Sequence, residues 1–341
     1  MLLLTKSVLA MMISFLLSLI IGSILIPLLK KKKANQRLNT YLRDAHKSKK
    51  DTPTMGGLIF IISTLITIVI LLLMNKINIS YHLIIVIITF TSYAFIGFLD
   101  DYLIIKRNNN KGLTQNQKLF FQIIIAVIFF YLFMKAGNEP LLWIHTLNIR
   151  KDIGWLYGVV ILFILTASSN AVNITDGLDG LSTGLSIIAF LAFGLISYNT
   201  GWLEGYNEIG LFCFILIGSL IGFLIFNSNP AKIFMGDTGS LSLGATLGSI
   251  AILTRHELLL IVIGIVFVIE TLSVILQVSY YKLTKKRLFP MTPLHHTFEK
   301  QGFIETDIVK IFWIIGLIGA MIAIGFGVWL WKNLISHYLY Q

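Results

Sequence analysis

Residues 154–180 read GWLYGVVILFILTASSNAVNITDGLDG, an apolar run that passes directly into two asparagines and two aspartates. The apolar part is about long enough to cross the roughly 30 Å hydrocarbon core of a bilayer as a helix. Polar and charged side chains at membrane depth are costly, so they usually face a cavity or a functional site. The stretch therefore indicates a membrane helix that ends in a binding or catalytic site.

The polar end of this stretch has helical spacing. Asn170, Asn173 and Asp176 follow one another at intervals of three, so on a helix their side chains share one rough face. Gly177 and Gly180 then let the backbone turn and approach a ligand closely. We expect the whole segment to contribute to a site.

The composition is that of an integral membrane protein. Of 341 residues, 56% are hydrophobic and 13% are charged, about half of the usual charged share. Apolar runs of roughly twenty residues recur along the chain, and no loop between them has room for a soluble domain. We predict an all-α, polytopic bundle of ten transmembrane helices that forms one catalytic domain, residues 1–341. The predicted spans are about 8–29, 56–74, 81–99, 118–135, 154–172, 180–198, 208–226, 237–253, 258–281 and 308–331.

The distribution of Lys and Arg predicts the orientation. Nineteen of the 27 basic residues fall in one alternating set of connections and seven in the other. Because basic residues stay preferentially in the cytoplasm, we place both termini outside and five basic-rich loops inside. The net charge of +11 reflects this asymmetry and attraction to anionic lipid. It does not indicate nucleic acid, since no soluble basic domain presents these residues.

Two further features give no indication of a catalytic or binding role. The single cysteine, Cys213, lies in an apolar run, which excludes a disulfide framework and a cysteine metal site. We expect it to be a small buried apolar residue. The outer loop at about 136–153 is expected to form a short hairpin or an interfacial segment.

The dense polar clusters all lie at predicted cytoplasmic helix ends, at residues 51–57, 100–101, 170–180, 227–239 and 290–299. Five of the sixteen acidic residues lie in these clusters at one predicted membrane depth: Asp100, Asp101, Asp176, Asp179 and Asp237. Any one of these aspartates has a plainer interpretation as a helix cap, but five together do not.

Carboxylates brought close together need a counter-charge. Two of them at 4 Å repel by about 4 kcal/mol at an effective dielectric constant near 20, so either they are spread apart or a cation lies among them. Hard oxygen ligands favour Mg²⁺, which shares its coordination shell with substrate phosphate. Asp237, after Gly236 at the start of a span, is the best ligand candidate. Asp100 and Asp101 point about 100° apart on a helix, so we expect them to have different roles.

Other polar residues near these ends fit the same chemistry. His295 and His296 lie in a basic loop and suit hydrogen bonds to phosphate or proton transfer near pH 7. Lys49 is either a phosphate partner or part of the general inside charge. Phe234 is either an anchor at the membrane edge or a stacking surface for a base, and on physical grounds alone the anchor is favoured.

The ninth apolar run contains Glu270 and Gln277. A buried glutamate there must be paired, protonated or facing water, and its role stays open. Gln277, two turns closer to the cytoplasm, is placed to line the floor of a site. The residues together predict a Mg²⁺-dependent phosphate site at the cytoplasmic face, with one substrate from water and one from lipid. Phosphoryl transfer there asks mainly for positioning and charge neutralisation.

These motifs resemble a known enzyme family, the bacterial phospho-N-acetylmuramoyl-pentapeptide transferases, which make lipid I. That family belongs to the wider polyprenyl-phosphate N-acetylhexosamine-1-phosphate transferases. The double aspartate at 100–101, NAVNITDGLDG at 170–180 and FMGDTGS at 234–240 are typical of the superfamily. TPTMGG at 52–57 and PMTPLHH at 290–296 are typical of the muramoyl-pentapeptide branch. The resemblance covers essentially the whole chain.

The resemblance implies transfer of phospho-MurNAc-pentapeptide from its UDP carrier to undecaprenyl phosphate, with Mg²⁺ as cofactor and release of UMP. It implies a multi-pass protein of the bacterial cell membrane with a cytoplasmic active site, and it leaves a homodimer open. Asp237 would bind the metal, Asp100 would deprotonate or position the lipid phosphate, and Asp101 would support that site. The predicted catalytic residues are Asp100, Asp101, Asp237, His295 and His296.

The segment and the resemblance together also predict a substrate-binding set: Lys49, Thr54, Asn170, Asn173, Asp176, Gly177, Asp179, Asn227, Phe234 and Gln277. By resemblance Phe234 would stack on uracil and Asp179 would bond the edge of the base. One position departs from the family, which usually shows three consecutive histidines where this chain ends with Thr297. Either that position is dispensable, or a hydroxyl holds its hydrogen bond.

Three alternatives were weighed. A sister enzyme that transfers GlcNAc-1-phosphate for teichoic acid or O-antigen would share the aspartates, but its loop is expected to carry a His-x-His-His pattern. A secondary transporter would place its site near the membrane midplane at a repeat interface, whereas these acids lie at one face and no repeat is evident. An inactive scaffold is disfavoured by the complete set of five aspartates.

Overall fold

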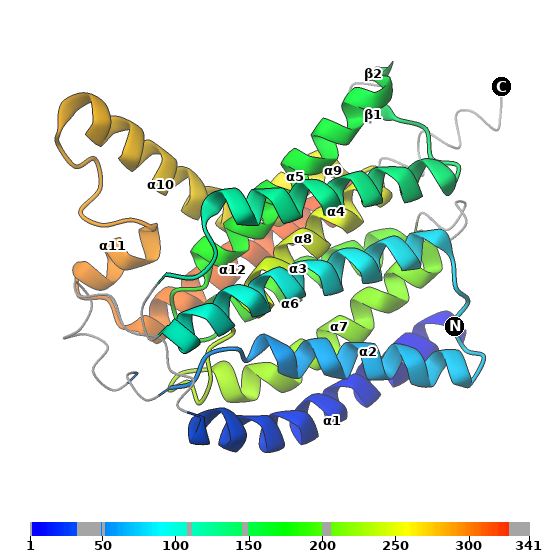
Figure 1. Ribbon diagram of the computed structural model, residues 1–341, viewed down its shortest axis with the longest axis horizontal. Coiled ribbons are helices and arrows are strands. Elements are labelled where there is room, and N and C mark those ends of the chain that lie inside the picture. The colour runs from blue at the N-terminus through cyan, green and yellow to red at the C-terminus, as the bar shows by residue number, and fades with distance from the viewer. Residues whose placement is uncertain are drawn as a thin grey trace.

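The computed structural model describes residues 2–32, 49, 52–107, 111–144, 149–199 and 206–326. In these ranges the chain forms a bundle of helices that lie side by side, with a short hairpin at one end (Figure 1). The elements are α1 (Leu2–Lys31), α2 (Gly57–Leu73), α3 (Tyr81–Arg107), α4 (Gln115–Lys135), β1 (Leu141–Ile144), β2 (Ile149–Asp152), η4 (Gly154–Leu156), α5 (Tyr157–Thr175), α6 (Leu181–Asn199), α7 (Tyr206–Asn227), α8 (Gly236–Leu253), α9 (Glu257–Ile263), α10 (Ile265–Thr284), α11 (Leu294–Lys300) and α12 (Glu305–Ile324).

The predicted membrane segments are helical. Eight helices of the described part are long and apolar enough to cross a membrane, and α2 is apolar but shorter, with 17 residues. The polytopic, helical membrane class is therefore confirmed. The end of the last predicted span, beyond residue 326, lies outside the described residues.

The ninth predicted span is not one continuous helix. Its backbone leaves the helical region at Gly264 (φ −94°, ψ 23°), which separates α9 from α10. Glycine is a poor helix former because it loses more backbone freedom than other residues. Beyond this break α10 points away from the bundle (Figure 1).

α8 lies at the centre of the bundle, packed against α3 on one side and α5 on another. All its residues from Thr238 to Leu253 are buried. Its many small residues let neighbouring backbones approach closely, as is usual between membrane helices. A Cβ atom on Gly97 of α3 would overlap the carbonyl oxygen of Asp237, and one on Gly57 of α2 would overlap the backbone of Gly239. The first turn of α8 is therefore held by two other helices.

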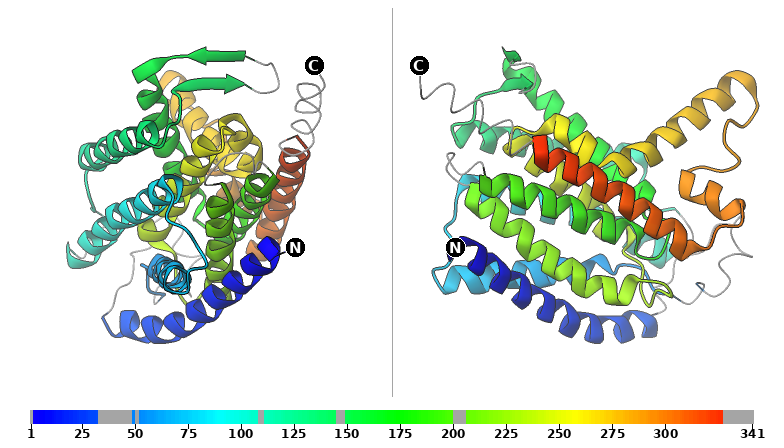
Figure 2. Two further views of the ribbon diagram at one scale, coloured as in Figure 1. Left: turned by 90° about the vertical axis from the view of Figure 1, so that its right-hand side faces the viewer. Right: turned by 180° about the vertical axis from the view of Figure 1, so that it is seen from behind.

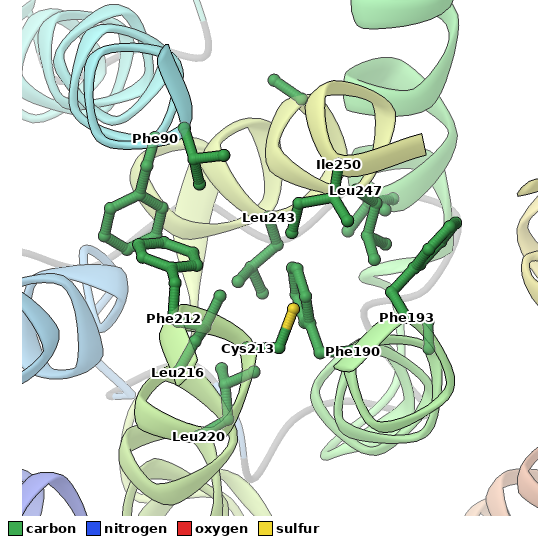
Figure 3. Packing of buried hydrophobic residues seen from close by; sticks show 14 of the residues in the cluster. Phe90, Phe190, Phe193, Phe212, Cys213, Leu216, Leu220, Leu243, Leu247 and Ile250 are labelled. Carbon is green, nitrogen blue, oxygen red and sulfur yellow. The ribbon is translucent and has the colours of Figure 1, made fainter. Parts of the chain in front are cut away.

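The apolar core lies between α3, α6, α7 and α8, as Figure 3 shows. Phe90 and Phe212 meet edge to face with ring centroids 5.7 Å apart. Cys213 is buried and unbonded among these side chains, which confirms its expected apolar role. Outside this core, α1 packs along α7 at the periphery of the bundle (Figure 2).

The loop between α4 and α5 contains the hairpin that was one of its two expected forms. β1 and β2 pair antiparallel, with Leu141 opposite Asp152 and Ile144 opposite Ile149.

We predict that Gly97→Ala destabilises the protein, because the added methyl group would push α3 away from the start of α8. Overpacking of this kind costs about 1–3 kcal/mol. The expected result is a lower unfolding temperature in detergent. Gly325→Ala is the matched control, since no atom lies within 4 Å of the position of its Cβ. Equal unfolding temperatures for the two variants would contradict the tight contact.

Candidate active site

Asp101, in the C-terminal part of α3, binds the first turn of α8. Its Oδ2 accepts hydrogen bonds from the backbone N–H of Thr238 at 3.0 Å and from the Thr238 hydroxyl at 2.6 Å. Its Oδ1 accepts from the backbone N–H of Asp237 at 3.2 Å. The first N–H groups of a helix have no partner within it and carry partial positive charge, so a buried carboxylate there is stabilising. Asp101 thereby fixes the position of Asp237.

Asp100 and Asp237 face the same ammonium group. Lys118 Nζ lies 3.0 Å from Asp100 Oδ1 and 2.9 Å from Asp237 Oδ2. The backbone N–H of Leu113 also donates to Asp100 Oδ1, at 2.7 Å. The carboxylates of Asp100 in α3 and Asp237 in α8 thus face one position, which the Lys118 ammonium group occupies. The sequence showed Lys118 only as one basic residue among many at the cytoplasmic side, so it was not predicted as a site residue.

The 170–180 segment reaches this position through one residue. Asn173 Nδ2 donates to Asp237 Oδ1 and to the Ser240 hydroxyl, at 2.8 Å in each case. Asn170 is exposed, and its amide donates to Thr166 of its own helix. A spacing of three residues drifts by about 60° per step. Asn170 therefore does not share a helix face with Asn173. Its amide bonds to Thr166, whereas the amide of Asn173 bonds to Asp237.

Asp176 ends α5 among other acids. Burial, followed by the carboxylates of Asp237, Asp101 and Asp179, raises the pKa of Asp176 to about 8. A bound cation would reverse the electrostatic part of this effect and favour the ionised form.

Asp179 belongs to a second group of polar residues. Its Oδ1 lies 2.7 Å from Lys49 Nζ, and its Oδ2 accepts from the backbone N–H of Ala231 and the amide of Asn229, at 3.0 and 3.1 Å. Glu305 of α12 binds the same lysine at 2.6 Å and accepts the backbone N–H of Asp179 at 2.7 Å. Neither Asn229 nor Glu305 was predicted. Glu305 was missed because an acid in the first turn of a helix ordinarily interacts with the helix terminus itself.

The TPTMGG turn is joined to the residues that precede α8. Phe234 donates its backbone N–H to the Pro53 carbonyl at 2.8 Å, and Gly56 donates back to the Phe234 carbonyl at 2.8 Å. Thr54 is buried nearby, and its hydroxyl has no hydrogen-bond partner in the described structure. The Phe234 ring remains partly exposed.

Asn227 is engaged within the protein at both ends of its amide. Its Oδ1 accepts from the Thr183 hydroxyl at 2.7 Å, and its Nδ2 donates to the Ile233 carbonyl at 3.1 Å. These bonds hold the loop that leads to Phe234. A direct role in substrate binding stays a prediction.

The histidines of α11 lie in two different environments. His295 is fully buried, with Nε2 against Gly177, and burial lowers its pKa. His296 is partly exposed, and its Nδ1 is 2.6 Å from Glu299 Oε2. Thr297, where the family usually has a third histidine, donates its hydroxyl to the Met291 carbonyl and so holds the preceding loop.

A cavity of about 660 Å³ opens between α10 and α11. Gln277 and His296 line it together with three basic side chains, Lys282 of α10, Arg287 of the connecting loop and Lys300 of α11. The Gln277 carbonyl oxygen accepts the backbone N–H groups of Leu288 and Phe289, at 3.0 and 2.9 Å.

The acids do not form a ready metal cluster. In the part of the chain that the structure describes, no three His, Cys, Asp or Glu side chains are grouped closely enough to hold an ion by themselves. Two carboxylates do converge on the Lys118 ammonium, and both offer hard oxygen donors. Mg²⁺ ordinarily binds through one or two carboxylates, with water and substrate phosphate completing its shell.

Comparison with known proteins identifies the family. The model for glycosyl transferase family 4 matches residues 83–255, and a phospho-N-acetylmuramoyl-pentapeptide-transferase signature matches residues 49–61. Enzymes of that name from Staphylococcus carnosus and Geobacillus thermodenitrificans are 47% and 44% identical to this chain. The alignments cover 93% and 95% of this chain and 98% of each relative. The chain belongs to the phospho-N-acetylmuramoyl-pentapeptide-transferase family. The family signature includes Lys49 and the TPTMGG turn, and the longer match extends from before Asp100 to beyond Asp237.

We predict that Asp101→Ala lowers the unfolding temperature more than Asp100→Ala does. Asp101→Ala leaves the backbone N–H groups of Asp237 and Thr238 without their acceptor, and such losses cost about 1–3 kcal/mol. Asp100→Ala leaves those bonds intact and removes one of two neighbouring acids. Thermal unfolding of both purified variants measures the difference. Equal decreases would show that Asp101 does not hold the start of α8.

Proposed function

We propose that this protein transfers phospho-N-acetylmuramoyl-pentapeptide from its UDP carrier to undecaprenyl phosphate, giving lipid I and UMP. One observation carries the proposal. Asp100 and Asp237 face a single cation position beside the 170–180 segment, in a member of a family whose relatives are named for this transfer. The alternative donor, UDP-GlcNAc, is not favoured, because the signature at residues 49–61 belongs to the muramoyl-pentapeptide enzymes.

We propose Mg²⁺ as the cofactor, held by Asp237 with Asp100 facing the same position. The fit rests on the two oxygen donors that converge on the position of the Lys118 ammonium group. When bound, Mg²⁺ would neutralise negative charge on the phosphates of the reacting group.

The residues around this position then have distinct tasks. Asp101 fixes the backbone of Asp237, and Asn173 orients the Asp237 carboxylate through its amide. Asp100 accepts a proton from the lipid phosphate or positions it. An oxygen of the lipid phosphate bonds to the phosphorus that carries the sugar, and the bond from that phosphorus to the UMP oxygen breaks. UMP leaves with the electron pair of the broken bond.

The second polar group is proposed to bind the nucleotide. Asp179 and Lys49 already contact each other, so a nucleotide would bind by exchanging these partners for its own groups. The half-exposed Phe234 ring would stack on uracil, and the buried Thr54 hydroxyl, which lacks a partner, would find one in the occupied site.

We also propose ten membrane spans with both termini outside and the active site at the cytoplasmic face of the bacterial cell membrane. The uneven distribution of Lys and Arg supports this orientation. Lys118 and the Lys106–Arg107 end of α3 lie on the same side as the aspartates, as that orientation requires.

The first test is the reaction itself. Purified protein with undecaprenyl phosphate should release UMP from UDP-MurNAc-pentapeptide and not from UDP-GlcNAc. Chelation by EDTA should stop the release and added Mg²⁺ should restore it. Asp237→Ala should lower turnover by at least about a thousandfold, since charge stabilisation at the reacting group is lost, while its unfolding temperature stays near that of the wild type. Product from UDP-GlcNAc alone would contradict the proposed donor.

The second test concerns Phe234. Stacking of a base on an aromatic ring contributes about 1–3 kcal/mol, so Phe234→Ala should raise the KM for the nucleotide sugar about tenfold. The KM for undecaprenyl phosphate should not change, and Phe234→Tyr should behave as the wild type. An equal effect on both substrates would identify Phe234 as an anchor of the fold.

A further inference from the structure

Glu270 is a fully buried carboxyl group that the proposed reaction does not use. It lies in α10 with none of its surface exposed, where the other buried residues of the helix are Val266, Phe267 and Ser273. Burying a carboxylate without a partner is costly. Beyond Ser273, α10 leaves the bundle and its side chains become largely exposed (Figure 1). Glu270 is therefore at the last part of α10 that packs on the rest of the protein.

Both oxygens of Glu270 face one residue. Oε1 accepts the backbone N–H of His295 at 3.1 Å, and Oε2 lies 3.3 Å from Nδ1 of the same histidine. The His295 side chain is also completely buried. The backbone bond satisfies an N–H group at the start of α11 that has no partner within its helix. Glu270 Oε2 and His295 Nδ1 face each other at 3.3 Å, and neither atom has a hydrogen-bond partner in the described structure.

The second ring nitrogen of His295 is enclosed against the 170–180 segment, which we propose binds the donor. His295 Nε2 lies against Gly177, the residue that follows Asp176, and has no hydrogen-bond partner in the described structure. Burial lowers the pKa of His295, although Glu270 opposes the shift. The imidazole is thus neutral at pH 7 and carries one proton. With a carboxylate beside Nδ1, that proton belongs on Nδ1, and Nε2 is left with a free lone pair.

We propose that Glu270 is a positioning residue that fixes the rotation and the tautomer of His295, so that Nε2 accepts a hydrogen bond from the donor substrate only in the transition state. The inference rests on the proposed function only for the identity of that substrate. A lone pair at Nε2 recognises an O–H or N–H group, such as a sugar hydroxyl or amide. It does not bind a phosphate oxygen, which is itself an acceptor. A carboxylate that orients a catalytic histidine in this way has large kinetic effects in other enzymes.

Glu270→Gln separates this role from a purely structural one. The glutamine carbonyl can still accept the His295 backbone N–H, so α11 stays attached to α10. Its NH₂ group then faces Nδ1 and donates to it, which moves the imidazole proton to Nε2 and abolishes the acceptor. We expect kcat to fall by at least about a hundredfold, with KM for both substrates within about threefold and an unchanged unfolding temperature.

Glu257→Gln is the matched control. Glu257 is a partly buried carboxylate of α9 that accepts a hydrogen bond from the Tyr157 hydroxyl. It follows the C-terminal end of α8, whereas Asp237 lies in the first turn of that helix. It should keep kcat near the wild-type value. A Glu270→Gln enzyme with kcat within about twofold of wild type would overturn the proposal, since a structural carboxyl group tolerates this exchange.

Nitrogen-15 NMR of the histidine-labelled, detergent-solubilised protein tests the tautomer without turnover. The signals missing from His295→Gln identify His295. The proposal requires a protonated Nδ1 and an unprotonated Nε2 in the wild type, and the reverse in Glu270→Gln. A protonated Nε2 in the wild type would overturn it. If the wild type released no UMP, the proposed reaction would fail, and the NMR result would still decide the tautomer.

Discussion

The attachment of α8 to Asp101 is the constraint on which the site depends. α8 lies in the middle of the bundle, and its first turn offers N–H groups that no residue of the helix itself can accept. Asp101 accepts two of them and the Thr238 hydroxyl as well. The close approach of Gly97 to Asp237 then leaves no space for the turn to shift. The carboxylate of Asp237 is thus held by its own backbone before any substrate arrives, which is the preorganisation that charge stabilisation requires.

The two adjacent acids of α3 show how one helix serves structure and chemistry together. Successive residues of a helix point about 100° apart. Asp101 therefore faces the interior and α8, while Asp100 faces Lys118 and the loop at Leu113. The sequence predicted different roles for the pair from this angle alone. It did not predict which acid would bind the helix start, because that depends on where α8 passes.

The features that the sequence predicted have a local signal in the chain. Several of those that it missed depend on contacts between distant residues. Long apolar runs predicted the helices because burial in lipid demands them locally. The aspartates were predicted as site residues because acids at membrane depth are costly and are usually functional. Lys118 and Glu305 were missed because a single charge at a helix end is ordinary, and their pairing across more than a hundred residues appears only in three dimensions. Asn170 does not join Asn173 because a spacing of three residues turns the side chain by about 60° around the helix. The break at Gly264 had only a lone glycine as its signal.

The Lys49 group has a consequence for the synthesis of the protein. Its members come from the beginning, the middle and the end of the described chain, since Lys49 is shared by Asp179 and by Glu305 of α12. Chains emerge and insert from the N-terminus, so Lys49 and Asp179 are in the membrane well before the second carboxylate exists. A nascent chain that has not yet inserted α12 lacks Glu305, and with it part of the proposed nucleotide site. The group formed by Lys49, Asp179 and Glu305 is therefore complete only after α12 has been synthesised and has packed on the bundle.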